Sequence, residues 1–192
     1  RGDYFATVCP DTSGEAVLIH QISKQRSQAP FRRTRKAGTS AMAVQCVCFH
    51  PTRPWLFVAT QRYVRIYDLV QQALVKTLQP GVRWISSLDV HPSGDHVILG
   101  SYDRRVQWFD LDLAERPYKT LRYHTRAVRA VAFPPHLPLF ASAADDGTVH
   151  VYHATVYSDL LQNALLVPLK ILRGHAVQQA LGVLSLAWHP TL

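Results

Sequence analysis

The chain has 192 residues, of which 47% are hydrophobic and 18% charged, and its formal net charge at pH 7 is +8. This composition is typical of a packed globular protein and excludes a disordered chain. No apolar stretch approaches the roughly 20 residues of a membrane helix, and neither a signal segment nor an initiating Met is present, so we expect a soluble chain cut from a longer one.

Two short runs near the N-terminus are predicted to be strands. DYFATV and AVLIHQI are rich in β-branched and aromatic residues, and Pro, Asp, Ser and Gly separate them. Compared with the repeated units farther along the chain, they match the second and third strands of a four-stranded unit. We expect the first strand of that unit to be missing.

The segment that follows is strongly basic. No Asp or Glu occurs from Ala16 to Tyr67, so this stretch carries a charge of +9 and the rest of the chain −1. Residues 26–43 mix basic residues with Gly, Ser and Ala, which predicts a solvated loop between two repeated units. Clustered basic side chains favour nucleic acid. We predict RNA contact through Lys24, Arg26, Arg32, Arg33, Arg35 and Lys36; a solvated loop or an acidic protein partner is the alternative.

One motif recurs four times in the remaining sequence. Its copies are VQCVCFHP, ISSLDVHP, VRAVAFPP and VLSLAWHP, which end at Pro51, Pro92, Pro135 and Pro190. The first two intervals, 41 and 43 residues, match the about 40–45 residues of a four-stranded propeller blade. The third interval is 55 residues, which indicates an insertion.

Each complete copy continues with an apolar run, a tight turn and an alternating run, the last being VRIYD, VQWFD or VHVYH. A four-stranded sheet of this kind buries both faces only when it is stacked radially against its neighbours. The sequence therefore predicts an all-β propeller with about three whole blades plus pieces at both ends, since the last copy stops after a first strand. We expect an arc of a seven-bladed ring.

The repeated units resemble WD repeats. Gly174 and His175 match the Gly-His pair that opens such a repeat, and DDGT at Asp145–Thr148 matches its turn between the second and third strands. The pairs YD and FD stand where Trp-Asp usually closes the third strand. The resemblance implies that the propeller is of the WD-repeat type.

The earlier copies match the WD pattern less completely. Turn aspartates fall at Asp103 and Asp146, whereas Gln61 takes that place in the first complete copy. WD repeats often carry a buried hydrogen-bond network of Asp, His, Ser and Trp, and the resemblance implies that Asp146 with His124 keeps part of it. Aromatic residues replace the Trp: Tyr67, Phe109 and Tyr152. The structural repeat positions are Asp103, His124, Asp146 and His175.

A more specific resemblance runs nearly from end to end of the chain. RSQAPFRR, RWISSLDVHPSGD, SYDRRVQWFDLDL and above all VYSDLLQNALLVPLKILRGH resemble the C-terminal propeller of the block-of-proliferation family of ribosome biogenesis proteins. Generic WD repeats have no segment like LLQN…LLVP between their third and fourth strands.

That resemblance implies a non-enzymatic scaffold in the nucleolus and nucleoplasm that supports processing of large-subunit ribosomal RNA. It further implies a trimeric complex with a pescadillo-like protein and a second WD-repeat protein, bound to large-subunit precursors. Neither a cofactor, a membrane nor a small-molecule substrate is expected.

The insertion within the last complete unit, over residues 154–168, contains four leucines. Pro168 ends any helix there, and the leucines are only loosely helical in spacing. They predict either a partner-docking element or a segment that covers an exposed blade edge. The leucines are Leu160, Leu161, Leu165 and Leu166.

Cys46, Cys48 and His50 share one face of a predicted strand, an arrangement that could approach a metal. The other copies hold mostly small residues where the cysteines stand: Ser87, Ala130, Ser185, Asp89, Ala132 and Ala187. We therefore interpret both cysteines as small buried residues and expect no metal site. With Cys9, the three cysteines are too few for a disulfide framework, which favours a reducing compartment.

Catalytic motifs are absent from the sequence. His50, His91 and His189 recur in the turn after each first strand, which indicates a repeated structural role. No nucleophile elbow, phosphate-binding glycine loop or paired-carboxylate motif occurs. We predict that the protein is not an enzyme and has no catalytic residues. A WD-repeat adaptor that binds peptides, such as a substrate receptor of a ubiquitin ligase, is the alternative to the ribosomal scaffold.

Overall fold

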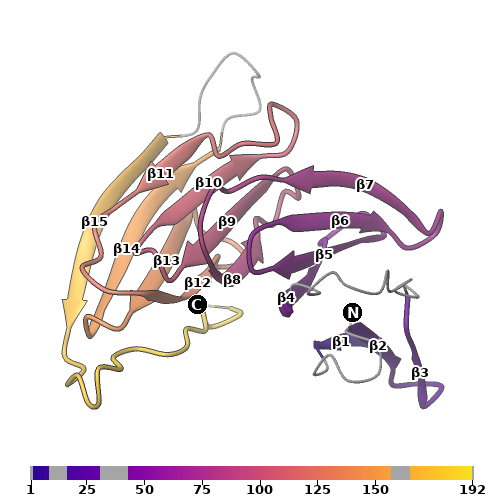
Figure 1. Cartoon of the computed structure of the whole chain (residues 1–192), viewed down its shortest axis with the longest axis horizontal. Helices are drawn as coiled ribbons and strands as arrows, with labels where there is room; N and C mark the ends of the chain where they lie inside the picture. Colours follow the sequence, from indigo (N-terminus) through magenta and orange to yellow (C-terminus); the bar gives the residue numbers. More distant parts are fainter. Residues whose placement is uncertain (1, 9–16, 31–42, 157–164, 192) are drawn as a thin grey trace.

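The computed structural model describes residues 2–8, 17–30, 43–156 and 165–191. Every regular element within these residues is a β-strand, and the strands form antiparallel sheets (Figure 1). The described residues contain no helix of the length and hydropathy needed to cross a bilayer. The predicted fold class, a partial WD-type propeller, is confirmed.

Three sheets have four strands each, paired in chain order, and we call them the first, second and third blades. The first blade consists of β4 (Val44–Phe49), β5 (Trp55–Thr60), β6 (Val64–Asp68) and β7 (Ala73–Leu78). The second consists of β8 (Ile85–Val90), β9 (His96–Ser101), β10 (Val106–Asp110) and β11 (Lys119–Leu121). The third consists of β12 (Val128–Ala132), β13 (Leu139–Ala144), β14 (Thr148–Thr155) and β15 (Leu165–Arg173).

A smaller sheet precedes the blades. It has three strands in chain order, β1 (Tyr4–Val8), β2 (Val17–Gln21) and β3 (Arg26–Gln28). These strands include the two runs predicted near the N-terminus. This N-terminal sheet packs its Val17 and Ile19 against Leu56 and Val58 of the first blade.

The blades repeat in detail as well as in outline. β4, β8 and β12 lie toward the inside of the arc, and β7, β11 and β15 lie at its outer edge (Figure 1). Each inner strand carries a β-bulge near its start, at Val44/Cys46, Ile85/Ser87 and Val128/Ala130. A bulge increases the local twist of a strand. Each blade therefore has the same local distortion in its inner strand, the strand nearest the propeller axis.

Apolar side chains fill the space between neighbouring blades. Phe57 and Phe109 are fully buried in the cluster between the first and second blades. Trp108 of the second blade packs against Phe140 of the third, with ring centroids 5.7 Å apart. Burial of one such side chain stabilises the fold by about 2–3 kcal/mol. A polar contact joins the same blades, because Asp89 accepts a hydrogen bond of 2.7 Å from the Phe133 N–H.

The last copy of the repeated motif differs from the prediction. Val183–Pro190 is not a strand in the structure, although Val183 is buried against the third blade and its N–H donates to the Ala144 carbonyl. The Trp188 indole N–H donates to the Ala132 carbonyl at 3.0 Å. A strand requires a hydrogen-bonded neighbour along its length, whereas Val183 and Trp188 make separate hydrogen bonds to the third blade that do not form a ladder.

The structure also describes the ends of two segments predicted from the sequence, the basic loop over residues 26–43 and the insertion over residues 154–168. Within 26–43, Arg26–Gln28 is strand β3 rather than loop, because its residues pair with β2. Within 154–168, Thr155 pairs with Leu165 at the end of the long β14–β15 hairpin. The described ends of the insertion therefore extend two blade strands. Residues 31–42 and 157–164 lie outside the described residues.

Candidate functional site

A buried polar network occupies the third blade. The Asp146 carboxylate, in the turn between β13 and β14, accepts hydrogen bonds from His124 Nδ1 and from the Thr125 N–H, each at 3.0 Å. His124 Nε2 lies 2.8 Å from the Ser142 hydroxyl, and Ser142 in turn hydrogen-bonds Tyr152. The structure thus joins Asp146 and His124 in a network in which Tyr152 stands where WD repeats have Trp.

The protonation states of this network follow from its surroundings. Burial raises the pKa of Asp146, but hydrogen bonds from Thr148, Thr125 and His124 outweigh it and lower that pKa to about 2. Burial lowers the pKa of His124, against the opposing effect of Asp146. The imidazole is therefore neutral near pH 7, with its Nδ1–H donated to the carboxylate. These groups hold the blade together, and their chemistry is structural.

Asp103 occupies the same turn of the second blade. Its carboxylate accepts a hydrogen bond of 2.7 Å from the Arg83 N–H, as Asp146 does from Thr125. The positions that correspond to His124, Ser142 and Tyr152 hold apolar residues in this blade. These residues pack in one cluster: Val82, Leu99 and Phe109. His175, the fourth predicted repeat position, is exposed, and its carbonyl lies against Gly147.

The residues predicted to contact RNA are described only in part. Lys24 lies in the turn between β2 and β3, and Arg26 is in β3; both are exposed. Arg32, Arg33, Arg35 and Lys36 lie outside the described residues.

The predicted partner-binding leucines divide in the same way. Leu165 is 47% exposed at the start of β15, whereas Leu166 is buried in the cluster between the second and third blades. Alternate residues of a strand face opposite sides of the sheet, so only Leu165 of this pair is available to a partner. Leu160 and Leu161 lie outside the described residues.

The two cysteines of β4 face the space between blades. Burial raises the pKa of both Cys46 and Cys48 to about 12, so both are neutral thiols near pH 7. A thiol must lose its proton to bind a metal. Among the described residues, no group of three or more His, Cys, Asp or Glu side chains could hold a metal ion.

The structure reveals a surface that the repeat analysis missed. Three backbone hydrogen bonds join turns and loops at one face of the blades: Ile85 N–H to Gln61 O between the first and second blades, Tyr102 N–H to Trp84 O within the second, and Asp145 N–H to Ala127 O within the third. We call this surface the arginine–aromatic face, and its exposed members include Arg62, Tyr63, Arg83, Trp84, Tyr102, Arg104 and Arg126.

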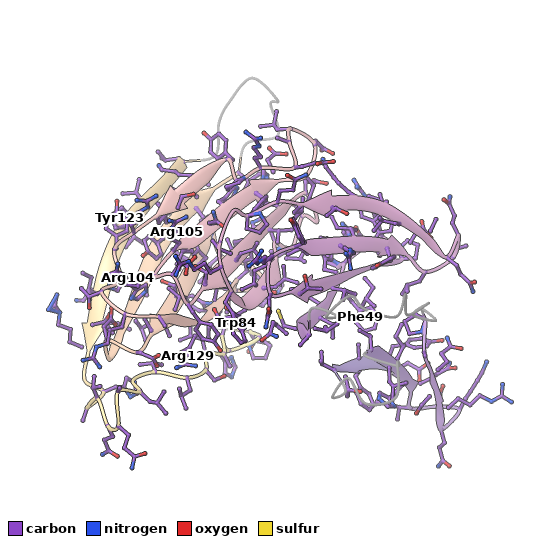
Figure 2. All side chains as sticks on the ribbon, viewed as in Figure 1. Phe49, Trp84, Arg104, Arg105, Tyr123 and Arg129 are labelled. Atoms are coloured by element: carbon purple, nitrogen blue, oxygen red, sulfur yellow. The ribbon has the colours of Figure 1, made fainter. Side chains whose placement is uncertain are left out.

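A chain of side-chain contacts crosses this face. The Trp84 indole N–H donates to the Gln45 side-chain oxygen at 2.9 Å, and the Trp84 ring meets the Tyr102 ring edge-on, with centroids 5.8 Å apart. The Arg129 guanidinium lies over the same Tyr102 ring, 4.9 Å from its centroid. Asp145 fixes that guanidinium through contacts of 2.7 Å. Figure 2 shows Trp84 and Arg129 toward the inside of the arc and Arg104 farther out.

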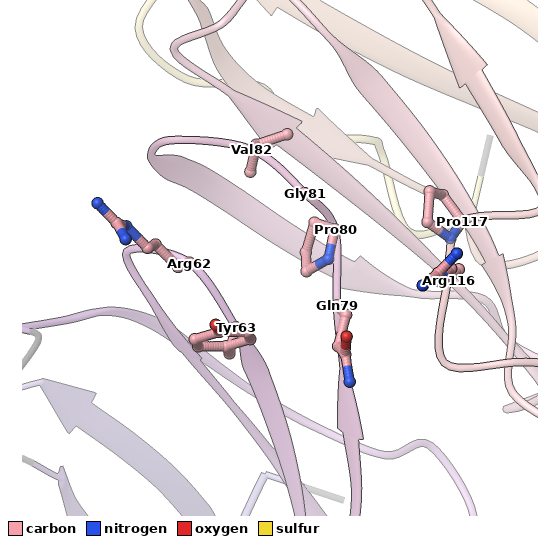
Figure 3. A pocket seen from close by; sticks show the side chains of 8 residues that line it. All are labelled: Arg62, Tyr63, Gln79, Pro80, Gly81, Val82, Arg116 and Pro117. Atoms are coloured by element: carbon pink, nitrogen blue, oxygen red, sulfur yellow. The ribbon is translucent and has the colours of Figure 1, made fainter.

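A hollow of about 420 Å³ opens where the first and second blades meet. Arg62 and Tyr63 lie on one side of it and Arg116 on the other (Figure 3). The loop between β7 and β8 lines its middle, and Gly81 there has a φ of +65°, a conformation that favours glycine. Gln79, also in the lining, hydrogen-bonds the Glu115 carboxylate at 3.2 Å.

Part of this surface has a signal in the sequence. An Arg and an aromatic residue stand together at corresponding turns, as in Arg62-Tyr63 and Arg83-Trp84, and Tyr102 is followed closely by Arg104. The same residues in other positions would be ordinary solvated side chains. Only the stacking of blades places them on one surface.

Comparison with known proteins identifies the repeats and the relatives of the whole chain. The family model for the WD domain, G-beta repeat, matches residues 31–68, 72–110 and 115–153. A "Ribosome biogenesis protein ERB1" of Malassezia globosa is 88% identical over 192 residues, which are 100% of this chain and 22% of that protein. Proteins of the same name are 62% identical over 190 residues in Schizosaccharomyces pombe and 58% identical over 190 residues in Saccharomyces cerevisiae.

The chain covers only part of these relatives. It aligns over 99% of its own length with the S. pombe and S. cerevisiae proteins but spans 25% and 23% of theirs. The similarity therefore concerns one part of a much longer protein.

Proposed function

The chain belongs to the WD domain, G-beta repeat family, and we propose that it forms part of a non-enzymatic propeller scaffold in ribosome biogenesis. The observation that carries this proposal is the identity of 58–88% with proteins named for ribosome biogenesis, over practically the whole chain. Because the chain spans about a quarter of those relatives or less, the proposal concerns the role of this part within the whole protein.

The chemistry of the described residues supports a scaffold rather than an enzyme. Asp146 and His124 are committed to each other and to the blade, and Asp145 is paired with Arg129. An enzyme of the acid–base or nucleophilic kind needs such groups free to meet a substrate. What the surface offers instead is guanidinium groups and aromatic rings, which suit recognition of another macromolecule.

In this proposal the propeller supports large-subunit ribosomal RNA processing through one protein-binding surface and one RNA-binding surface. The protein partners are a pescadillo-like protein and a second WD-repeat protein in a trimeric complex, and the place of action is the nucleolus and nucleoplasm. The acid-free stretch that contains the exposed Lys24 and Arg26 supplies phosphate contacts. A peptide-reading adaptor has no need of such a stretch.

Co-purification of the tagged full-length protein from cells tests this function. The pescadillo-like protein and large-subunit precursor RNA should both be recovered with the wild type. Recovery of ubiquitin-ligase subunits, with neither the pescadillo-like protein nor precursor RNA, would overturn the proposal in favour of an adaptor.

A charge variant separates the two surfaces. Replacement of Arg32, Arg33, Arg35 and Lys36 by Ala should leave the pescadillo-like protein bound and lower the salt dependence of RNA binding, since four phosphate contacts contribute about 3 to the slope of log K against log salt. Lys170 and Arg173 on β15, both exposed, serve as the charge control. An unchanged slope in the first variant would exclude those residues as the RNA contact.

A further inference from the structure

We propose that the arginine–aromatic face binds an extended acidic segment of a protein partner, with carboxylates at Arg62, Arg104 and Arg126 and an apolar side chain against Trp84. The inference rests on the proposed function only for its setting, a ribosome-assembly complex. That function requires a protein-binding surface, and the geometry of this face supplies one. The face shares no residue with the six basic residues predicted to contact RNA.

Arg104 has a backbone conformation that an arginine rarely adopts. Its φ is +65°, in the left-handed region, within the turn between β9 and β10. The corresponding turn of the third blade has Gly147 there, with a φ of +77°. Both residues donate their N–H to the last residue of the preceding strand, to Ser101 O and Ala144 O. Glycine adopts this conformation without the steric cost that a Cβ brings. An arginine at a position that favours glycine therefore indicates a use for its side chain outside the fold.

The charge of the face is positive because its nearby carboxylates already have partners. The Asp145 carboxylate is paired with Arg129 at 2.7 Å, and Asp103 accepts the Arg83 N–H. Within the described residues, no carboxylate forms an ion pair with four exposed arginines of the face: Arg62, Arg83, Arg104 and Arg126. A carboxylate brought by a partner therefore meets guanidinium groups that form no ion pair within this part of the chain.

These arginines come from three neighbouring blades. Arg62 lies in the turn between β5 and β6, Arg104 in the corresponding turn of the second blade, and Arg126 in the segment that leads into β12. The blades follow one another along the arc (Figure 1), so a ligand that contacts all three arginines must be extended. In an extended peptide, side chains on the same side are about 7 Å apart. Several carboxylates of one segment can therefore meet different blades.

Trp84 and Tyr102 form the apolar part of the face. The Trp84 indole N–H is bonded to the Gln45 side-chain oxygen, so the exposed surface of this ring is apolar. The Tyr102 ring has the Arg129 guanidinium over one face and the Trp84 ring against it at an angle of 66°. A nucleic-acid base needs an open ring face for stacking, and Arg129 occupies one face of Tyr102. Trp, Tyr and Arg are also the residues that contribute most to protein–protein binding.

The face is already ordered before a partner binds. Its three backbone hydrogen bonds fix the turns and loops that carry the arginines. The side-chain contacts from Gln45 through Trp84 and Tyr102 to Arg129 cross from the first blade to the third. A surface whose side chains are ordered loses less entropy when a partner binds.

The hollow extends the positive surface beyond the face. Arg62 and Tyr63 belong to the face and also line the hollow, and Arg116 lies on its opposite side, before β11 (Figure 3). Pro80 and Pro117 add apolar lining between them. A guanidinium binds a carboxylate through paired hydrogen bonds. The hollow therefore suits an Asp or Glu side chain at one end of the bound segment.

Fluorescence anisotropy of the full-length protein with a labelled acidic peptide tests the proposal. The probe is a 12-residue peptide of Asp and Glu with two leucines at its centre. Trp84→Ala should weaken binding by about 30-fold or more, the loss typical of a hot-spot residue. Arg104→Asn should weaken it by about 2- to 5-fold, the contribution of one exposed charge pair. Arg173→Asn, at an exposed arginine of β15 outside the face, should leave binding unchanged.

The thermal unfolding midpoint separates a role in binding from a role in the fold. Asn adopts the left-handed conformation more readily than Arg does, so the midpoint of Arg104→Asn should be no lower than that of the wild type. A lower midpoint together with unchanged peptide binding would show that Arg104 serves the fold and would overturn its assignment as a contact.

A charge reversal tests the same site without relying on a loss of binding. Arg104→Asp with Arg126→Asp reverses the charge at two turns, and Asp also tolerates the left-handed conformation. The double variant should bind the acidic peptide more weakly than the wild type does. It should bind the same peptide with Lys at every acidic position more tightly than the wild type does, a gain that an unfolded variant cannot give. An unchanged preference for the acidic peptide would overturn the proposal.

Two further results would also overturn it. One is full peptide binding by Trp84→Ala together with loss of binding when Arg32, Arg33, Arg35 and Lys36 are replaced by Ala. The other is a failure to bind the peptide while single-stranded RNA binds and is weakened by Trp84→Ala and Arg104→Asn. Both leave the proposed function standing, because that function is tested separately by co-purification of the pescadillo-like protein and precursor RNA.

Discussion

The second and third blades hold the same turn aspartate in different surroundings. In the third blade Asp146 belongs to a buried polar network with His124, Ser142 and Tyr152. In the second blade Asp103 keeps only the backbone bond, and apolar residues fill the rest. Both blades have the same strand order and the same bulge. A blade can therefore be stabilised either by a fully hydrogen-bonded polar network or by apolar packing, provided that all the residues of the network are replaced together.

The largest effect expected from this comparison is that of Asp146→Ala. It removes the acceptor of four donors and leaves them without this partner: the Thr125 N–H, the Thr148 N–H, the Thr148 hydroxyl and His124. The free energy of unfolding of the third blade should fall by about 3 kcal/mol. Hydrogen exchange of the β13 and β14 amides in the full-length protein measures it. Protection equal to that of the wild type would show that the network does not stabilise the third blade.

Phe109 of the second blade and Tyr152 of the third occupy the same position. Replacing each by the other's residue type should lower the stability of the second blade more than that of the third. Phe109→Tyr places a hydroxyl beside Leu99 in the apolar cluster between the first and second blades, so the second blade should lose about 2 kcal/mol. Tyr152→Phe removes the hydrogen bonds of the hydroxyl with Ser142 and His150 and should cost the third blade about 1 kcal/mol. Addition of Val82→His and Leu99→Ser to Phe109→Tyr supplies the missing partners. A triple variant no more stable than Phe109→Tyr would argue against the equivalence of the two blades.

Asp103→Ala should have a smaller effect than Asp146→Ala. The carboxylate accepts one described hydrogen bond, from the Arg83 N–H in an exposed loop, and its loss should cost about 1 kcal/mol. Urea unfolding of both variants under the same conditions gives the difference. Equal destabilisation by the two substitutions would remove the distinction between the blades.

Acid should weaken both blades alike, because each contains buried neutral histidines. Burial lowers the pKa of His91 and of His150 to about 4. The unfolded chain, with a His pKa near 6.5, binds more protons than the folded chain between those values, so stability is lost as the pH falls below about 6.5. The melting temperature should fall from pH 7.5 to pH 5, and less in His150→Gln. An unchanged melting temperature at pH 5 would contradict the stated pKa shifts.

The fold was largely predictable because its determinants are local and repeated. Alternating β-branched residues and turn residues recur at blade spacing, so the three whole blades and the N-terminal strands follow from the sequence, and the resemblance to WD repeats and to ribosome biogenesis proteins is confirmed. The exception is Val183–Pro190, which has the sequence of an inner strand but lacks strand partners among the described residues.

The surface was less predictable than the fold. The arginine–aromatic face joins Trp84, Tyr102 and Arg129, which belong to different repeated units and meet only through the angle between blades. Nothing in the spacing of one repeat gives that angle. The RNA residues from Lys24 to Lys36 and the leucines of the insertion remain predictions, because most of them lie outside the described residues.

Ultraviolet crosslinking of the full-length protein to RNA in living cells tests the central claim most directly. If this part of the protein is a docking surface in ribosome assembly, crosslinked RNA should consist mainly of large-subunit ribosomal precursors. The crosslinked peptides should come from the basic segment between Ala16 and Tyr67. Recovery of the protein without precursor ribosomal RNA would contradict the claim.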